Sequence, residues 1–177
     1  PRVRSLSFVR NCGQSAALCA GFHAARGEWI VTLDADGQNP PEEIERLIAL
    51  ESEADFITGI RQERRDAISR KIASAVAQWF RKLILGDVTR DTGCALRMFK
   101  REIVQAIPLF QNFHRFFTFL VRRQGFRIRE IPVKHAPRMA GVTCYTQWRR
   151  LREGLFDIWG VFWLKFRMIG YEVRDGS

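Results

Sequence analysis

The sequence has 177 residues, of which 46% are hydrophobic and 27% are charged. This length and composition predict one globular domain with its own core, and they exclude a collagen-like, disordered or disulfide-stapled chain. The net charge is +10, but residues 1–60 contain 5 basic and 9 acidic side chains, whereas residues 61–177 contain 24 and 10. The second part is therefore expected to bind an anionic partner, such as nucleic acid, a phosphorylated substrate or an acidic membrane surface.

The first third of the sequence alternates between strand-like and helix-like segments. In chain order we expect a strand at 3–9, a helix at 14–26, a strand at 29–33, a helix from Asn39 to about Ser52 and a strand at 55–60. Such alternation with short connections is typical of parallel β-α-β units, in which helices cover both faces of a sheet. Ligands bind beyond the carboxyl ends of such strands, so the residues after Leu33 are candidates for a site.

The rest of the chain predicts longer helices. We expect a helix at 67–85, a loop with a short extended piece at 91–99, a helix at 113–123, a strand at 126–133, a loop at 137–145 and a helix at 147–169. The last helix has an aromatic, apolar stripe with basic flanks, which favours a position on an anionic membrane surface. Packing on the sheet and dimerisation are the alternatives. We divide the chain into a domain at 1–146 and this helix with its tail at 147–177.

Cysteine usage and hydropathy predict where the protein acts. The four cysteines form no C-x-x-C pair, and no histidine lies at zinc-ligand spacing, which is typical of a reduced, cytosolic protein. No signal peptide opens the chain, and the apolar run at 158–164 is too short to span a bilayer, which takes about 20 residues. The expected location is cytoplasmic, peripheral on the cytosolic face of the membrane.

Asp34 and Asp36 are the most informative residues in the sequence. They follow a buried strand and precede a helix that starts with Pro40 and Pro41. Two carboxylates one residue apart can both reach one divalent ion, and the amide oxygen of Gln38 can add a third ligand. Oxygen ligands suit Mg²⁺ or Mn²⁺, which would bridge a diphosphate, neutralise the leaving group and act as a Lewis acid. Two solvated aspartates in a turn are the alternative.

Five motif-like segments occur along nearly the whole chain. They are Asn11-x-Gly13 with Ala20-Gly21 and Ala25-x-Gly27, Asp34–Glu43, Gly59-x-Arg61 with Arg70, Asp91-Thr92-Gly93 with Arg97, and Ile131–Val133 with Arg138, Gly141 and Tyr145. In this order they resemble the motifs of the family 2 glycosyltransferases. Asp34–Glu43 resembles the signature D-A-D-L-Q-x-P-P-E of the branch that glycosylates polyprenyl phosphates, typified by dolichol-phosphate mannosyltransferase.

The resemblance implies a GT-A-like α/β fold, with a parallel or mixed sheet and helices on both faces. It implies a metal-dependent hexosyltransferase that moves a sugar from a GDP- or UDP-linked donor to a dolichyl or undecaprenyl phosphate, using Mg²⁺ or Mn²⁺. By position, Asp34, Asp36 and Gln38 would hold the metal, and Asp91 would be the catalytic residue near the reacting centre. Phosphate contacts would come from Arg61, Arg70 and Arg138, and other substrate contacts from Asn11, Gly13 and Thr143.

The chemistry of the acceptor leaves two roles open. A lipid phosphate is already anionic, so a strong base is less needed, and electrostatic positioning by the metal and by arginines should dominate. Asp91 can therefore orient an arginine or cap a turn instead of accepting a proton. Arg61 can belong to a solvated loop, whereas Arg138 lies in a loop between Pro137 and Gly141, where binding residues are common.

The sequence departs from the family pattern at three places. The first β-α-β unit, which forms half of the family's nucleotide pocket, has no counterpart, so we expect an N-terminally truncated domain. Thr143-Cys144-Tyr145 stands where the family has S-K-Y, which removes a cation. Gly37 replaces the usual Leu, and we expect it to loosen the turn.

Two other functions are compatible with parts of the sequence. A family 2 transferase with a polysaccharide or another acceptor would contain the same motifs. A non-catalytic basic fragment, such as a nucleic-acid binder or a membrane scaffold, would explain the charge of residues 61–177 but not two aspartates at a strand end, and no nucleic-acid motif is present. The expected partners are a nucleotide sugar, a polyprenyl phosphate and a membrane surface, with no nucleic acid.

Overall fold

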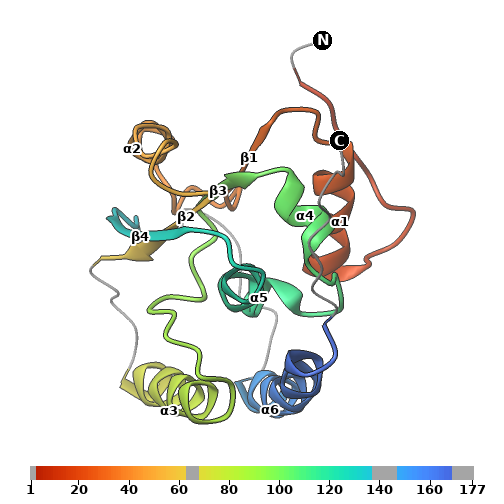
Figure 1. Cartoon of the computed structure of the whole chain (residues 1–177), viewed down its shortest axis with the longest axis vertical. Helices are drawn as coiled ribbons and strands as arrows, with labels where there is room; N and C mark the ends of the chain where they lie inside the picture. The colour runs from red at the N-terminus through yellow and green to blue at the C-terminus, as the bar shows by residue number, and fades with distance from the viewer. Residues whose placement is uncertain (1–2, 63–67, 137–146, 169–177) are drawn as a thin grey trace, which may run out of the picture. The chain divides into compact units, whose positions relative to one another are not determined.

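The computed structural model describes residues 3–62, 68–136 and 147–168. The chain divides into two compact units. The first unit consists of Pro1–Arg64 and Thr89–Val142, and the second of Arg65–Val88 and Thr143–Ser177. Figure 1 shows the helices and strands of both units in chain order. All the strands of the described residues belong to the first unit.

The first unit is built on a four-stranded sheet in the order β1-β3-β2-β4. The strands are β1 (Trp29–Thr32), β2 (Phe56–Arg61), β3 (Arg97–Lys100) and β4 (Ile128–Val133). β3 runs antiparallel to both of its neighbours, with Arg97 opposite Thr32 and Thr58, and β2 runs parallel to β4. The strands β1, β2 and β4 therefore point the same way, and their carboxyl ends share one edge of the sheet with the start of β3.

One face of the sheet packs against α2 (Glu43–Ile48) (Figure 1). Because side chains alternate along a strand, Ile57 of β2 and Met98 of β3 point to this face, where they join Leu47 of α2 in one buried cluster. The cluster also contains Ala54, Cys94, Leu96 and Val133. The helix begins later than expected because the chain after Asn39 first forms a turn, in which the backbone N–H of Glu43 donates to the carbonyl of Pro40 at 3.1 Å.

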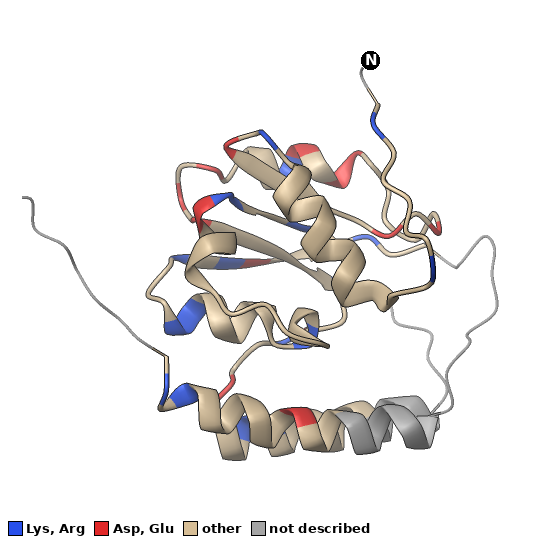
Figure 2. Cartoon of the chain, turned by 90° about the vertical axis from the view of Figure 1, so that its right-hand side faces the viewer, with Lys and Arg blue, Asp and Glu red and all other residues tan. Residues whose placement is uncertain are grey.

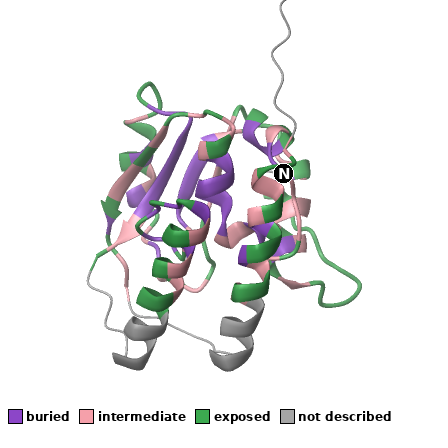
Figure 3. Cartoon of the chain, turned by 60° about the horizontal axis from the view of Figure 1, so that its bottom comes forward, coloured by how far each residue is buried: buried purple, intermediate pink, exposed green. Residues whose placement is uncertain are grey.

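The other face of the sheet is covered by aromatic side chains. The elements on this side are α1 (Gly13–Ala24), α4 (Glu102–Ala106), η1 (Phe113–Arg115) and α5 (Phe117–Arg123). Five buried rings have neighbouring centroids 5.0–6.1 Å apart, mostly edge to face, and they are Phe22, Phe56, Phe99, Phe113 and Phe117. Figure 3 shows the central strands as the most buried part of the unit.

The mixed α/β fold with helices on both faces agrees with the expectation, and the structure differs from the local predictions at four places. Residues 3–9 form no strand, and Val3 and Val9 are exposed, because no strand of the described sheet pairs with this segment. The antiparallel β3 lies between β1 and β2, so the sheet is not a run of parallel units. The helix expected at 113–123 divides at Phe116 into η1 and α5, and α4 was not expected.

The second unit consists of two helices, α3 (Ile68–Leu85) and α6 (Gln147–Lys165), which pack against each other. A buried ion pair closes the end of α3, where Nη2 of Arg81 donates to Oδ2 of Asp87 at 2.8 Å. The Nζ of Lys165 donates to the carbonyl of Leu85 at 3.3 Å, which ties the last turns of the two helices together. Both helices start and end close to the positions predicted from the sequence.

The helix pair has large apolar side chains both in its interior and on its surface. Ile158 and Val161 of α6 are buried, and among the described residues of the unit five aromatic side chains are exposed, namely Trp79, Phe156, Trp159, Trp163 and Phe166. Basic residues gather at the carboxyl end of α6, as Figure 2 shows. Among the described residues, neither of these helices is long and apolar enough to cross a membrane.

Candidate functional site

Four loops meet at the edge of the sheet where β1, β2 and β4 end. Two hydrogen bonds join the loop after β1 to the loop after β4. The backbone N–H of Ala136 donates to the carbonyl of Gln38 at 2.9 Å, and Nε2 of Gln38 donates to the carbonyl of Ala136 at 3.4 Å. The end of β2 contacts the loop before β3 through Arg61 and Asp91. The sheet thus brings together segments that lie up to about 100 positions apart in the sequence.

The Asp34–Gln38 loop presents two carboxylates to solvent. Asp34 is exposed, and Asp36 and Gln38 are half-buried. The backbone N–H of Gln38 donates to Oδ1 of Asp36 at 3.1 Å, so the aspartate itself stabilises the turn. Gly37 has a φ of 76°, a conformation that residues with a side chain rarely adopt. This gives a physical reason for glycine at a position where the resemblance suggested a looser turn.

The donor set of this loop fits a hard divalent cation. Accessible carboxylate oxygens on one turn are the ligands that Mg²⁺ and Mn²⁺ take in proteins, together with water and substrate phosphates. Within the described residues, no group of three or more His, Cys, Asp and Glu side chains could hold a metal ion. The side chains of Asp34 and Asp36, with the amide of Gln38, are the residues of this chain that would contribute ligands.

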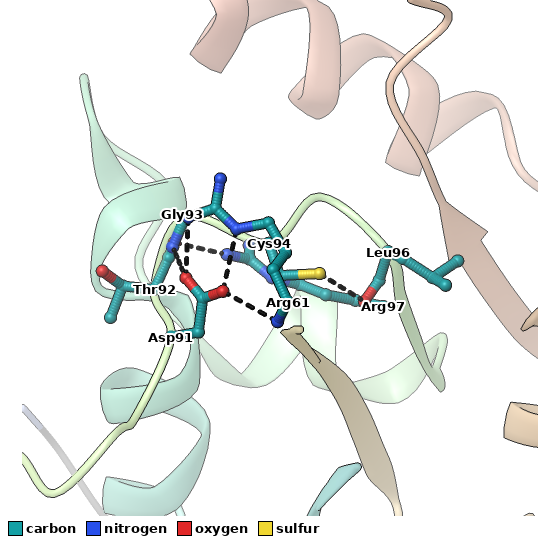
Figure 4. Close-up of polar contacts among 7 residues, drawn as sticks. All are labelled: Arg61, Asp91, Thr92, Gly93, Cys94, Leu96 and Arg97. Atoms are coloured by element: carbon teal, nitrogen blue, oxygen red, sulfur yellow. Dashed lines mark hydrogen bonds and ion pairs between the residues drawn. The ribbon is translucent and has the colours of Figure 1, made fainter. Parts of the chain in front are cut away.

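Asp91 and Arg61 form a side-by-side ion pair, drawn in Figure 4. Nε and Nη2 of Arg61 donate to the two carboxylate oxygens of Asp91 at 2.8 and 2.9 Å. The backbone N–H groups of Arg61 and Gly93 donate to the same carboxylate at 3.1 and 3.0 Å. Burial by itself raises the pKa of Asp91, but these hydrogen bonds and the charge of Arg61 outweigh it and hold the pKa below the ordinary value for aspartate.

Arg97 is a buried cation that the sequence motifs included without a role. Its Nη1 donates to the carbonyl of His114 at 3.1 Å and its Nη2 to the carbonyl of Thr92 at 3.0 Å, whereas its buried Nε has no hydrogen-bond partner. Burial lowers the pKa of Arg97 to about 10, partly offset by the negative charges of nearby groups that include Asp91 and Asp34. Arg97 therefore provides a buried positive charge close to both Asp34 and Asp91.

A polar network supports Arg97 on its far side. The pKa of His114 is lowered to about 4, first by burial and then by the charges of Arg97 and Arg115. Nδ1 of His114 lies 3.2 Å from Oγ of Ser15, which in turn accepts a hydrogen bond from the backbone N–H of Asn112 at 2.8 Å. No sequence motif indicated these contacts, because Ser15 and His114 lie 99 positions apart in the chain.

The other predicted site residues lie away from these contacts or outside the described part of the chain. The backbone N–H of Gly13 donates to Oδ1 of Asn11 at 2.9 Å at the start of α1, and this is a local turn contact. Arg70 lies in α3, and its side chain is outside the described residues, as are Arg138 and Thr143. The roles of these five residues stay predictions.

The fold is shared with glycosyltransferases of known structure. A crystal structure of glucosyl-3-phosphoglycerate synthase from Mycobacterium tuberculosis in complex with Mn²⁺, UDP and phosphoglyceric acid has a TM-score of 0.63 and 15% identity, covering 94% of this chain and 58% of that chain. A complex of the same enzyme with Mg²⁺ and UDP has a TM-score of 0.60 and 17% identity, covering 87% and 57%. This likeness confirms the GT-A-like fold that the resemblance implied.

Sequence comparison assigns the chain to a family within that class. Residues 1–108 match the profile of glycosyl transferase family 2, and the chain belongs to this family. The undecaprenyl-phosphate 4-deoxy-4-formamido-L-arabinose transferases of Salmonella paratyphi B and Salmonella newport are each 39% identical to it over 157 residues, which is 88% of this chain and 48% of the relative. The chain thus spans about half the length of these curated relatives.

Proposed function

We propose that the protein transfers one sugar from a nucleoside diphosphate donor to a polyprenyl monophosphate, with the help of Mg²⁺ or Mn²⁺. The observation that carries the proposal is the solvent-facing pair Asp34 and Asp36 at the sheet edge of a family 2 chain. Relatives 39% identical to the chain are named for undecaprenyl phosphate, which favours a lipid phosphate over a polysaccharide as the acceptor.

The divalent cation would neutralise the diphosphate as it leaves the sugar. Asp34 and Asp36 would bind it with carboxylate oxygens and Gln38 with its amide oxygen, while the contacts of Gln38 with Ala136 would hold the loop in place. Structures with the same fold were crystallised with UDP and either Mn²⁺ or Mg²⁺, which supports a uridine donor ahead of a guanosine donor and leaves both cations as candidates.

The acceptor needs a positive contact more than a base. An oxygen of the lipid phosphate would attack the anomeric carbon, the bond from that carbon to the donor diphosphate would break, and the nucleoside diphosphate would leave with its electron pair. Because the attacking oxygen is already anionic, no proton has to be removed first. Arg61, with Arg70 and Arg138, would bind phosphates, and Asn11, Gly13 and Thr143 would make other substrate contacts.

A lipid acceptor requires access to a bilayer, and the second unit offers a suitable surface. The exposed side chains Phe156, Trp159 and Trp163 of α6 are amphipathic or apolar, as expected for residues at the level of lipid headgroups. Lys165 and Arg167 follow them at the carboxyl end, where they can attract anionic lipids. We therefore place the protein on the cytosolic face of a membrane, bound at its surface.

Replacement of Asp36 by Ala tests the proposal most directly. In the full-length protein, the Asp36→Ala variant should lose metal-dependent transfer of sugar to lipid phosphate, because one of two carboxylate ligands is gone. The measurement is the incorporation of labelled sugar into an undecaprenyl phosphate extract, at several Mn²⁺ concentrations and with UDP- and GDP-linked donors.

Glu51→Ala is the matched control, since Glu51 is an exposed carboxylate of the same unit that lies outside the site. This control variant should transfer sugar at the wild-type rate. Undiminished transfer by Asp36→Ala would refute the assignment of the metal loop. Transfer to a soluble sugar acceptor, with none to the lipid extract, would favour a polysaccharide-type transferase instead.

A further inference from the structure

Gly93 lies so close to the guanidinium of Arg61 that a side chain at this position would have to displace the guanidinium. A β-carbon on Gly93 would overlap Nη2 of Arg61 and would lie 3.3 Å from Cζ of the same side chain. It would also lie 3.5 Å from Oδ1 of Asp91. Gly93 is not among the glycines with a positive φ. Glycine is therefore favoured at this position because it has no β-carbon, and not because the backbone conformation is unusual.

The carboxylate of Asp91 holds the same guanidinium in place by hydrogen bonds. It accepts from two nitrogens of the Arg61 side chain and from two backbone N–H groups, so both of its oxygens are engaged. A bidentate pair of this kind holds the planar fork of arginine in a single orientation. In Figure 4 the remaining nitrogen of the guanidinium, Nη1, points away from the carboxylate.

The two partners differ in exposure. The Asp91 side chain is 6% exposed, whereas the Arg61 side chain is 18% exposed. The carboxylate is thus enclosed by its donors, and the cation is the member of the pair that solvent reaches. A side chain that contacts substrate has to be accessible from solvent, and in this pair Arg61 is the more accessible of the two.

We propose that Asp91 and Gly93 are positioning residues that hold the guanidinium of Arg61 in one orientation for an anionic phosphate of the substrate. The role of Arg61 toward that phosphate rests on the proposed function. In this arrangement Asp91 acts through Arg61 and accepts no proton from the acceptor. A cation held in place before the substrate arrives stabilises developing charge without reorganising during the reaction. Gly93 is needed because a side chain there would push the guanidinium off the carboxylate.

The orientation of Arg61 can be measured without any activity. In the chain labelled with ¹⁵N-arginine, the Nε–H of Arg61, assigned from its loss in Arg61→Lys, should be protected from exchange with solvent. Asp91→Asn, which keeps the shape of the side chain, and Gly93→Ala, which keeps both charges, should each speed this exchange by at least about 10-fold, as expected when a charge-assisted bond worth more than one decade in an equilibrium is lost.

Gly21→Ala is the matched control, because a β-carbon on Gly21 meets nothing within 4 Å and the residue lies in α1 of the same unit. Exchange at Arg61 should be unchanged in this variant. We call the hold of Asp91 and Gly93 on the Arg61 guanidinium the clamp. Equal exchange at Arg61 in the wild type, Asp91→Asn and Gly93→Ala would refute the clamp, whether or not the protein transfers sugar. Circular dichroism on each variant shows that the comparison is made on folded protein.

A double-mutant cycle tests the role of the clamp in transfer. In the full-length protein, Arg61→Met should lower kcat/KM by about 100-fold, the usual loss when one preorganised donor is removed. Asp91→Asn should lower it less, and the double variant should be no slower than Arg61→Met alone, because Asp91 has no route to the substrate except Arg61.

The opposite result is equally clear. If the two losses multiply, or if Asp91→Asn removes the acid limb of the pH–rate profile, Asp91 acts as a base and the proposal is wrong. A full-length wild-type protein that transfers no sugar would refute the proposed function and the phosphate role of Arg61, and the exchange measurement would then still decide whether the clamp exists.

Discussion

The Asp34–Gln38 loop and the Asp91–Gly93 loop lie at the same edge of the sheet and use their aspartates in opposite ways. Asp34 is exposed and Asp36 is half-buried, on a turn that faces solvent. Asp91 is buried and fully engaged by Arg61 and by backbone N–H groups. A carboxylate that is to bind a metal has to stay reachable, whereas one that orients an arginine does better enclosed.

Each loop also contains a glycine, and the two glycines serve different needs. Gly37 has a φ of 76°, so its backbone conformation excludes most other residues. Gly93 has an ordinary backbone, and it is the guanidinium of Arg61 that leaves no room for a side chain. A glycine close to an aspartate can therefore be required by the backbone conformation in one loop and by side-chain crowding in another.

The largest expected contrast between the loops is in stability. Asp91→Ala leaves the Arg61 cation without its carboxylate in a mostly buried position, and we expect the free energy of unfolding to fall by about 3 kcal/mol. Asp34→Ala removes an exposed side chain, and we expect a change within about 0.5 kcal/mol. Urea unfolding followed by far-ultraviolet circular dichroism measures both. Similar losses in the two variants would show that the aspartates are not divided in this way.

The pH dependence of stability should come from the buried titratable groups of the site, His114 and Asp91. His114 has a pKa of about 4 in the fold against an ordinary value of about 6.5, so between these values the unfolded chain binds a proton that the fold does not. Stability should therefore fall as the pH drops from 6.5 toward 4, by at most about 1.4 kcal/mol per pH unit from this group.

His114→Asn identifies the source of that slope. The variant cannot titrate in this range, so its urea midpoint should vary less between pH 7 and pH 4.5 than that of the wild type. Asp91 contributes at still lower pH, because its depressed pKa gives stability that is present above the ordinary aspartate value and is lost as the pH falls below it. An unchanged slope in His114→Asn would mean that the histidine is not buried as a neutral ring.

Sequence patterns predicted much of the fold because the apolar periodicity of each element is local. β1, β2 and β4, with α1, α3 and α6, lie within a few residues of their predicted positions. The antiparallel placement of β3 was not predicted, because strand order depends on contacts between segments far apart in the chain. Residues 3–9 show the converse error, since strand-like composition without a partner strand forms no strand.

The site was predictable to the same extent. The carboxylates of the Asp34–Gln38 loop could be chosen because both lie within a few residues of a strand end. The sequence allowed Asp91 to orient an arginine, but it gave no means to choose Arg61, which lies 30 positions away. The motif at 91–97 included Arg97 without a role, and no spacing indicated His114, because the importance of both lies in burial and in contacts between distant segments.

Metal binding should also distinguish the Asp34–Gln38 loop from the Asp91–Gly93 loop, by a smaller change in stability. A cation present at ten times its dissociation constant stabilises the fold by about 1.4 kcal/mol, so saturating Mn²⁺ should raise the melting temperature of the wild type by a few degrees. Asp34→Ala and Asp36→Ala should abolish this rise, and Asp91→Asn should keep it. A rise that persists in both loop variants would place the cation elsewhere on the chain.

The smallest expected effect concerns the turn that holds the metal loop. Gly37→Ala forces a β-carbon into the left-handed region, at a cost of about 1 kcal/mol, and the turn can avoid this only by releasing the bond from Gln38 N–H to Asp36. The fold should lose little, whereas the Mn²⁺-dependent rise in melting temperature should shrink, since the two carboxylates no longer share one turn. Gly21→Ala, at an exposed helical position with room for a methyl group, should leave that rise intact. If Gly37→Ala responds to Mn²⁺ as the wild type does, the turn conformation is not what prepares Asp34 and Asp36 for the cation, and the metal itself must organise the loop.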